Sequence, residues 1–165
     1  MKTLQLKLAT LMLACLFMTS CSPEDDGIFF EELLETKTEY SDMELEILDL
    51  VNNYRLTKSL DPLEKLDFIS SVAYSHTTYM VEKGEANHDN FAERHENLVI
   101  NADALKVGEN VAYGYSSAES VVNAWLKSPG HKGIIENQGF THFGISTEMD
   151  DEGRYFYTQL FIERE

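Results

Sequence analysis

The sequence predicts an α+β domain in which helices come first and a β-hairpin comes last. Three stretches before residue 130 carry apolar residues at helical spacing, and side chains alternate with a period of two after residue 142. Such a separation of helices and strands along the chain is typical of layered α+β folds. The 165 residues, 43% of them hydrophobic, are enough for one domain and a targeting segment.

Residues 1–20 have the pattern of a secretory signal peptide. A short basic region ends at Lys7, and the apolar run from Leu8 to Met18 is too short to span a membrane as a helix. Cys21 follows a small residue at the end of this run, as in a lipobox, where the cysteine receives a lipid. Cys15 also follows a small residue, but cleavage there would leave apolar residues on the mature chain. We therefore expect an exported lipoprotein anchored to the membrane through Cys21; the alternative is an ordinary signal peptide with an incidental cysteine.

Residues 21–40 are interpreted as an acidic tether. The run Ser22-Pro23-Glu24-Asp25-Asp26 resembles the surface-export signals of some Gram-negative lipoproteins, which would place the protein at the outer membrane or cell surface. A merely solvated linker is the alternative. No cysteine follows Cys21, so the domain has no internal disulfide and no thiol nucleophile.

The domain is expected to occupy residues 41–165 and to open with two helices. Ser41 and Glu44 have the spacing of a capping box, and Leu45, Leu48 and Val51 share the apolar face of the helix that follows. A second helix is expected from Asp67, with Gly84 as its C-terminal stop. Its apolar stripe consists of Ile69, Val72, Ala73, His76 and Met80.

Two further helices and a hairpin complete the predicted domain. Helices are expected over 90–98 and 117–127, the latter with Trp125 as a core anchor, and a short turn opens after Ser128-Pro129-Gly130-His131. Residues 109–113 lie between two glycines, and we assign no element to them. Alternating side chains predict strands over 143–147 and 155–162, joined by a loop at 150–153.

The acidic composition excludes one class of partner. The formal net charge is −16, from 29 acidic and 13 basic residues. Such a surface repels phosphate backbones, so we expect no nucleic acid among the partners. The charge is well explained as a means of keeping an envelope protein soluble.

An ordered set of short motifs resembles the bacterial branch of the CAP superfamily (cysteine-rich secretory proteins, antigen 5 and pathogenesis-related 1, with an SCP-like domain). The motifs are, in order, Asn52-Asn53-Tyr54-Arg55, Ala73-Tyr74-Ser75-His76, His88, Arg94, Gly108-Glu109-Asn110-Val111-Ala112, Trp125-Leu126-Lys127-Ser128-Pro129-Gly130-His131-Lys132, Gly144 and Tyr157-Thr158-Gln159. The resemblance covers roughly residues 41–161. It implies a three-layer α-β-α sandwich with a central antiparallel sheet and an open cleft on one side.

The resemblance also implies a candidate site. Animal and plant relatives have two His and two Glu in the cleft, often able to bind a divalent metal. His88 and Glu109 match one of each; Ser128 and Phe156 stand where the second Glu and His would be, and His131 is expected to bring a second imidazole. His88, Glu109 and His131 are therefore the candidate ligands of Zn²⁺ or another divalent cation.

Two nearby residues complete the predicted binding site. Asn110 could support the metal ligands, and His76 either reaches the cleft or is a satisfied core histidine. A purely structural network of these side chains is the alternative to ligand binding. No Gly-x-Ser-x-Gly nucleophile motif is present.

The resemblance favours a non-enzymatic, envelope-anchored binding module and assigns no catalytic residue. Its cleft would take a small amphipathic molecule, a glycan or protein ligand, or a divalent metal. A metal-assisted hydrolase of envelope peptides or glycans, with Glu109 as base, and a surface adhesion or structural protein are the alternatives.

Overall fold

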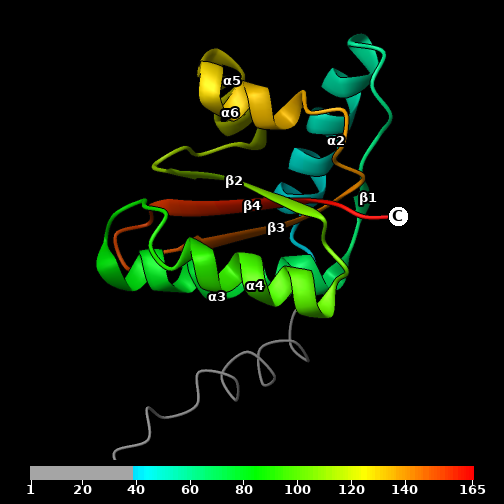
Figure 1. The fold of residues 1–165 in the computed structure, drawn as a ribbon. Coiled ribbons are helices and arrows are strands. Elements are labelled where there is room, and N and C mark those ends of the chain that lie inside the picture. The colour runs from blue at the N-terminus through cyan, green and yellow to red at the C-terminus, as the bar shows by residue number, and fades with distance from the viewer. Residues whose placement is uncertain (1–38) are drawn as a thin grey trace, which may run out of the picture.

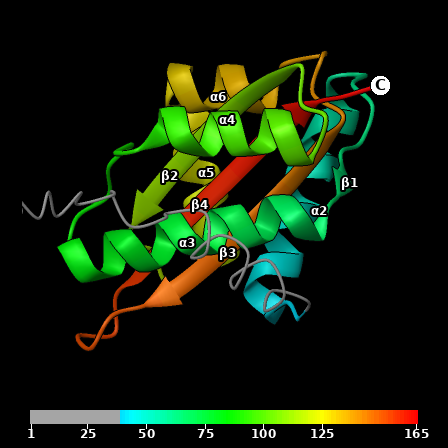
Figure 2. The same cartoon turned by 60° about the horizontal axis from the view of Figure 1, so that its bottom comes forward.

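The computed structural model describes residues 39–165, which form three layers with a sheet in the middle (Figures 1 and 2). One face of the sheet is covered by α2 (Asp42–Thr57), α5 (Ala118–Lys127) and α6 (Pro129–Ile135). The other face is covered by α3 (Asp67–Lys83) and α4 (Phe91–Asn101). The predicted α+β class and its α-β-α layering are confirmed.

The predicted signal peptide, the lipid site at Cys21 and nearly all of the tether lie outside the described residues. Within the described part of the chain, no helix has the length and apolar character needed to cross a bilayer.

The sheet has the strand order β1-β3-β4-β2. The strands β2 (Lys106–Tyr113), β4 (Tyr155–Glu163) and β3 (His142–Met149) are antiparallel, and the two-residue β1 (Glu64–Lys65) adds a parallel edge to β3. The hairpin of β3 and β4 confirms the prediction for the C-terminal residues. β2, which the sequence did not predict, forms the opposite edge of the sheet and carries Glu109 and Asn110.

The start of α2 and the end of α3 follow the predicted capping signals, whereas α4 ends at Asn101, three residues beyond its predicted end. The Ser41–Glu44 capping box begins α2, and Gly84 ends α3 in the left-handed conformation with φ 73°. The predicted inner face of α2 was wrong at Leu45, which is 42% exposed, whereas Ile47 and Val51 are fully buried. The Glu44 side chain is also buried, because its Oε1 accepts a hydrogen bond from the backbone N–H of Thr147 at 2.8 Å.

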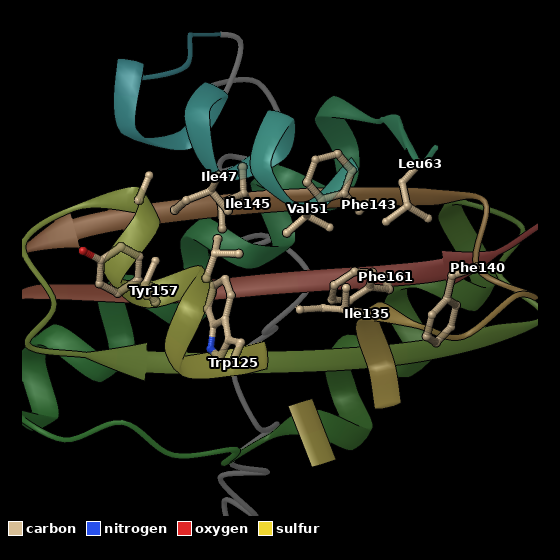
Figure 3. Packing of buried hydrophobic residues seen from close by; sticks show 13 residues of the cluster. Ile47, Val51, Leu63, Trp125, Ile135, Phe140, Phe143, Ile145, Tyr157 and Phe161 are labelled. Carbon is tan, nitrogen blue, oxygen red and sulfur yellow. The ribbon is translucent and has the colours of Figure 1, made fainter. Parts of the chain in front are cut away.

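The main core lies between the sheet and the α2–α5–α6 layer (Figure 3). Trp125 is its largest side chain, is 1% exposed, and donates its Nε1–H to the carbonyl of Val111 at 3.1 Å. This confirms Trp125 as a core anchor and ties α5 to the edge strand β2. The remaining large buried members come from α2, α6, the strands and the loop between α6 and β3: Ile47, Val51, Ile135, Phe140, Phe143, Ile145, Tyr157 and Phe161.

On the other face, α3 lies directly against β3 at Gly144. A Cβ added to Gly144 would lie 2.3 Å from the backbone nitrogen of Ser70 and 2.5 Å from the carbonyl carbon of Ile69. Only a residue without a side chain permits this distance between helix and strand. Gly144 therefore sets the depth at which α3 packs, and α3 in turn supports the site.

A buried arginine fixes the connection from α6 to β3. Arg55 is 1% exposed, and its guanidinium donates to the carbonyls of Asp61, Ile135, Asn137 and Phe140 at 2.7–3.2 Å. Four carbonyl oxygens thus accept hydrogen bonds from a buried guanidinium, in place of the carboxylate partner expected of most buried arginines. The arrangement holds residues 135–140, including Phe140, in place beside β2.

Candidate functional site

The loop that carries His88 is fastened to α3 by side-chain contacts. His76 donates its Nε2–H to the carbonyl of Asn87 at 2.8 Å, and the Tyr79 hydroxyl donates to the Asp89 carboxylate at 2.9 Å. Burial lowers the pKa of His76, and the positive charge of Arg94 lowers it further. His76 is 2% exposed and is therefore a satisfied core histidine that positions the loop, the second of the two interpretations of this residue.

His88, Glu109 and Arg94 form a compact polar cluster between this loop, β2 and α4. The Nδ1 of His88 lies 2.7 Å from Glu109 Oε1. Arg94 donates its Nε–H to Oε2 at 2.7 Å and its Nη2–H to Oε1 at 2.9 Å. A third bond, from Nη1 to the carbonyl of Asp89 at 2.6 Å, joins the guanidinium to the loop. The carboxylate therefore accepts three charge-assisted or polar hydrogen bonds in a buried setting.

Glu109 is held in its ionised form and is poorly suited to act as a base. Burial alone would raise its pKa, but hydrogen bonds from His88 and Arg94 and the charge of the guanidinium lower the pKa below the ordinary value. Both carboxylate oxygens are also occupied. The arrangement can orient the imidazole of His88, whose side chain is 53% exposed, toward a ligand.

Asn110 and His131 lie on the other face of β2 from Glu109. Successive strand residues point to opposite faces, so Asn110 points toward α6, where its Nδ2 donates to the backbone carbonyl of His131 at 3.4 Å. The Asn110 Oδ1 and both amide atoms of the neighbouring Gln159 are buried without a hydrogen-bond partner in the described part of the chain. The pKa of the His131 imidazole is lowered by burial and by the nearby charge of His88.

Two cavities flank β2, and the two predicted imidazoles line different ones. The first, of about 330 Å³, is lined by His88 and Glu109 at one end, by Lys106, and by apolar surface from Phe91, Val107, Gly108, Ile134 and Phe140, with Gly133 and Asn137 completing it. The second, of about 290 Å³, is lined by His131 with Trp125, Tyr113, Tyr115 and neighbouring residues. The structure thus brings His88 and Glu109 into contact, and places His131 close enough to sense the charge of His88 but in the adjoining cavity.

The sequence did not identify several residues of this site. Arg94 was noted only as one of the motif residues, and the structure pairs it with the central carboxylate Glu109. Arg94 lies six residues after His88 and one turn into α4, and this spacing was the signal in the sequence that could have placed it beside His88. Phe91, Lys106 and Phe140 were not distinguishable as cavity residues, because their convergence depends on β2 and on the loop held by Arg55.

The side chains in place do not fit a three-ligand metal centre. Among residues 39–165, no three His, Cys, Asp or Glu side chains group so that they could hold a metal ion. At Glu109, the guanidinium of Arg94 occupies the position that a bound cation would need. Zn²⁺ binding by His88, Glu109 and His131 stays a prediction, and no chemical step is built on it.

Comparisons with known proteins point to one family. The Cysteine-rich secretory protein family, CAP, matches residues 48–161. The uncharacterized membrane protein YlbC of Bacillus subtilis (strain 168) is 33% identical over 130 residues, which are 73% of this chain and 34% of the relative. The uncharacterized protein YkwD of the same strain is 30% identical over 122 residues, 72% of this chain and 46% of the relative. The chain thus spans less than half the length of these curated relatives.

Solved structures share the fold. An outer surface protein from Borrelia burgdorferi has a TM-score of 0.66 and 22% identity, and the alignment covers 77% of this chain and 98% of that one. An extracellular protein containing an SCP domain from Bacillus anthracis str. Ames has a TM-score of 0.63 and 27% identity, with 74% and 40% covered.

Proposed function

The chain belongs to the Cysteine-rich secretory protein family, CAP, and from this premise we propose that its domain is a binding module for a small amphipathic ligand. The cavity of about 330 Å³ beside β2 carries the proposal. Small-molecule sites are typically concave and mostly apolar, with a few convergent polar groups. Here Phe91, Ile134 and Phe140 supply apolar walls, and the His88–Glu109 pair supplies a polar end. Apolar walls suit an amphipathic molecule better than a glycan or a bare cation.

The cluster favours binding over hydrolysis. A metal-assisted hydrolase would use Glu109 as base, but that carboxylate is buried, ionised and bound on both oxygens. The hydrolase alternative predicts turnover of peptidoglycan or casein that Glu109→Gln abolishes. The binding proposal predicts no turnover of either substrate by the unaltered chain.

Attachment to the envelope is proposed on separate grounds. The signal-like residues 1–20 and the position of Cys21 support export and lipidation, and solved proteins of the same fold carry the names outer surface protein and extracellular protein. Incorporation of labelled palmitate that is lost in Cys21→Ala would support the anchor. Protease treatment of intact cells then tests surface display, which requires loss of the domain without lysis.

The binding proposal is tested with the neutral fluorescent probe N-phenylnaphthylamine and the full chain carrying Cys21→Ser, which has no lipid of its own at that site. Gly133 and Gly130 both lie on α6, and a Cβ at either would meet no atom within 4 Å. Only Gly133 lines the cavity. Gly133→Leu should therefore fill the cavity and weaken probe binding about tenfold or more, and Gly130→Leu should leave it unchanged. Equal binding by the two variants would reject the cavity as the site.

A further inference from the structure

Asn110 and Gln159 form a buried pair of amide side chains beneath α6. The two residues stand opposite each other where β2 pairs with β4, and both are 0% exposed. Residues directly opposite each other on antiparallel strands point to the same face of the sheet, with Cβ atoms about 4.5–5.5 Å apart. Asn110 faces α6, where it reaches His131, so both amide groups share one small space between the sheet and α6.

Most of the hydrogen-bonding groups of this pair are unmet by the protein. Asn110 Oδ1 and the Oε1 and Nε2 atoms of Gln159 have no hydrogen-bond partner in the described part of the chain. The remaining group, Asn110 Nδ2, reaches the carbonyl of His131 at 3.4 Å, which is longer than the usual range of about 2.7–3.2 Å. Buried polar groups without partners are costly and rare. Three such atoms in one space therefore point to a ligand that both donates and accepts hydrogen bonds.

The side-chain donors of the neighbouring core residues are already used. Trp125 donates its Nε1–H to the carbonyl of Val111 at 3.1 Å. The Tyr157 hydroxyl donates to the carbonyl of Tyr115 at 2.6 Å. Other large side chains of this core are apolar, among them Ile135, Ile145 and Phe161. These core residues therefore offer the amide oxygens of the pair no free donor.

Water can reach the pair from the cavity beside Trp125. That cavity, of about 290 Å³, is lined by Ala112, Trp125 and His131 among others. Ala112 lies two residues from Asn110 on β2 and therefore on the same face of the sheet. The amide pair thus lies just behind a cavity through which water can enter.

We propose that at least one water molecule is a resident ligand of the domain, held between Asn110 Oδ1 and the amide group of Gln159. Water can donate to Oδ1 and accept from Nε2 at the same time, whereas an ion of either sign would leave one kind of group unmet. By fixing the Asn110 amide, the water supports its bond to the carbonyl of His131 on α6. The inference goes beyond the proposed binding function and stands whether or not a cavity takes a ligand.

Contacts between water and the Gln159 amide test the site directly. NMR measures cross-relaxation from water to side-chain amide protons in the full chain carrying Cys21→Ser and a ¹⁵N label, and Gln159→Met identifies the Gln159 signals. We expect the protons on Nε2 of Gln159 to contact a water that tumbles with the protein. Gln159 amide protons in contact with Asn110 and not with water would overturn the inference, because the two amides would then bond to each other.

The stability of Gln159→Met is a second test, because the two possibilities predict opposite signs. Methionine has nearly the length of glutamine but makes no bond to the water, so Asn110 Oδ1 loses its link to β4. Urea denaturation should show that the folding equilibrium constant falls about fivefold or more. Gln138→Met, at an exposed glutamine, is the matched control and should leave the constant unchanged.

The double variant Asn110→Leu/Gln159→Met removes both sides of the site. Replacing both members of a buried polar contact by apolar groups of similar shape can be nearly neutral, so the double variant should recover most of the loss. If Gln159→Met is as stable as Gln138→Met or more stable, the amide had no bound water to lose, and the inference is overturned. A double variant less stable than Gln159→Met would overturn it as well.

Discussion

Replacing Arg94 by Met should be one of the most damaging single changes in the domain. Arg94 and Glu109 are 3% and 5% exposed, and the guanidinium supplies two of the three hydrogen bonds that the carboxylate receives. Arg94→Met therefore leaves a buried carboxylate with His88 as its remaining partner. Loss of one member of a buried ion pair costs about 3–5 kcal/mol of unfolding free energy. Urea denaturation followed by circular dichroism measures the loss.

The double variant Arg94→Met/Glu109→Leu shows whether the cost comes from the stranded charge. With both charges gone, the remaining losses are the donor to the Asp89 carbonyl and the partner of His88, or about 1–3 kcal/mol together. The double variant should thus be at least as stable as Arg94→Met alone, a strongly non-additive result. Additive costs, or a loss below about 1 kcal/mol for Arg94→Met, would refute a buried, mutually neutralising pair.

Three further predictions concern pH, the buried arginine and helix packing. Because the native pKa of Glu109 lies below 4.5, its contribution to stability is complete above pH 4.5 and is lost as the pH falls through the lower native pKa. Free energies of unfolding measured across this pH range should therefore decrease in the unaltered chain by an amount that is absent in Glu109→Gln. Arg55→Met should lower the free energy of unfolding by about 3–5 kcal/mol, because four carbonyls lose their donor. A loss in urea denaturation no larger than that of a surface substitution would contradict this. Gly144→Ala should lower the free energy of unfolding by about 3 kcal/mol, because its Cβ clashes with the backbone of α3. Gly130→Ala, whose Cβ meets no atom within 4 Å, should not lower it. Thermal melting of the two variants measures the difference.

The helix ends could be predicted from signals within a few residues of each end. The Ser41 capping box and the left-handed Gly84 are short-range features, so the ends of α2 and α3 follow from residues a few positions apart. Periodicity failed at Leu45 because a carboxylate, Glu44, takes a buried place on the inner face of α2. A pattern of apolar residues cannot predict a buried polar residue whose hydrogen-bond partner is a backbone group far away in the sequence.

The candidate site could be predicted only in part, because its residues are brought together by the pairing of strands that are far apart in the sequence. β2 contains Gly108 and Asn110, which are poor strand formers, and its eight residues are ordered by pairing with β4 at the end of the chain. Without β2, the sequence could not show that Glu109 and Asn110 face opposite layers. Family resemblance correctly selected His88 and Glu109 as neighbours, whereas Arg94 as the partner of the carboxylate required the fold.

A crystal structure of the chain grown with N-phenylnaphthylamine tests the central claim most directly. We expect the probe to lie between Phe91, Ile134 and Phe140, with its amine at the His88 end of the cavity and with Arg94 still bound to Glu109. Probe density confined to the cavity of Trp125 and His131, or a His88 ring turned away from Glu109, would contradict it.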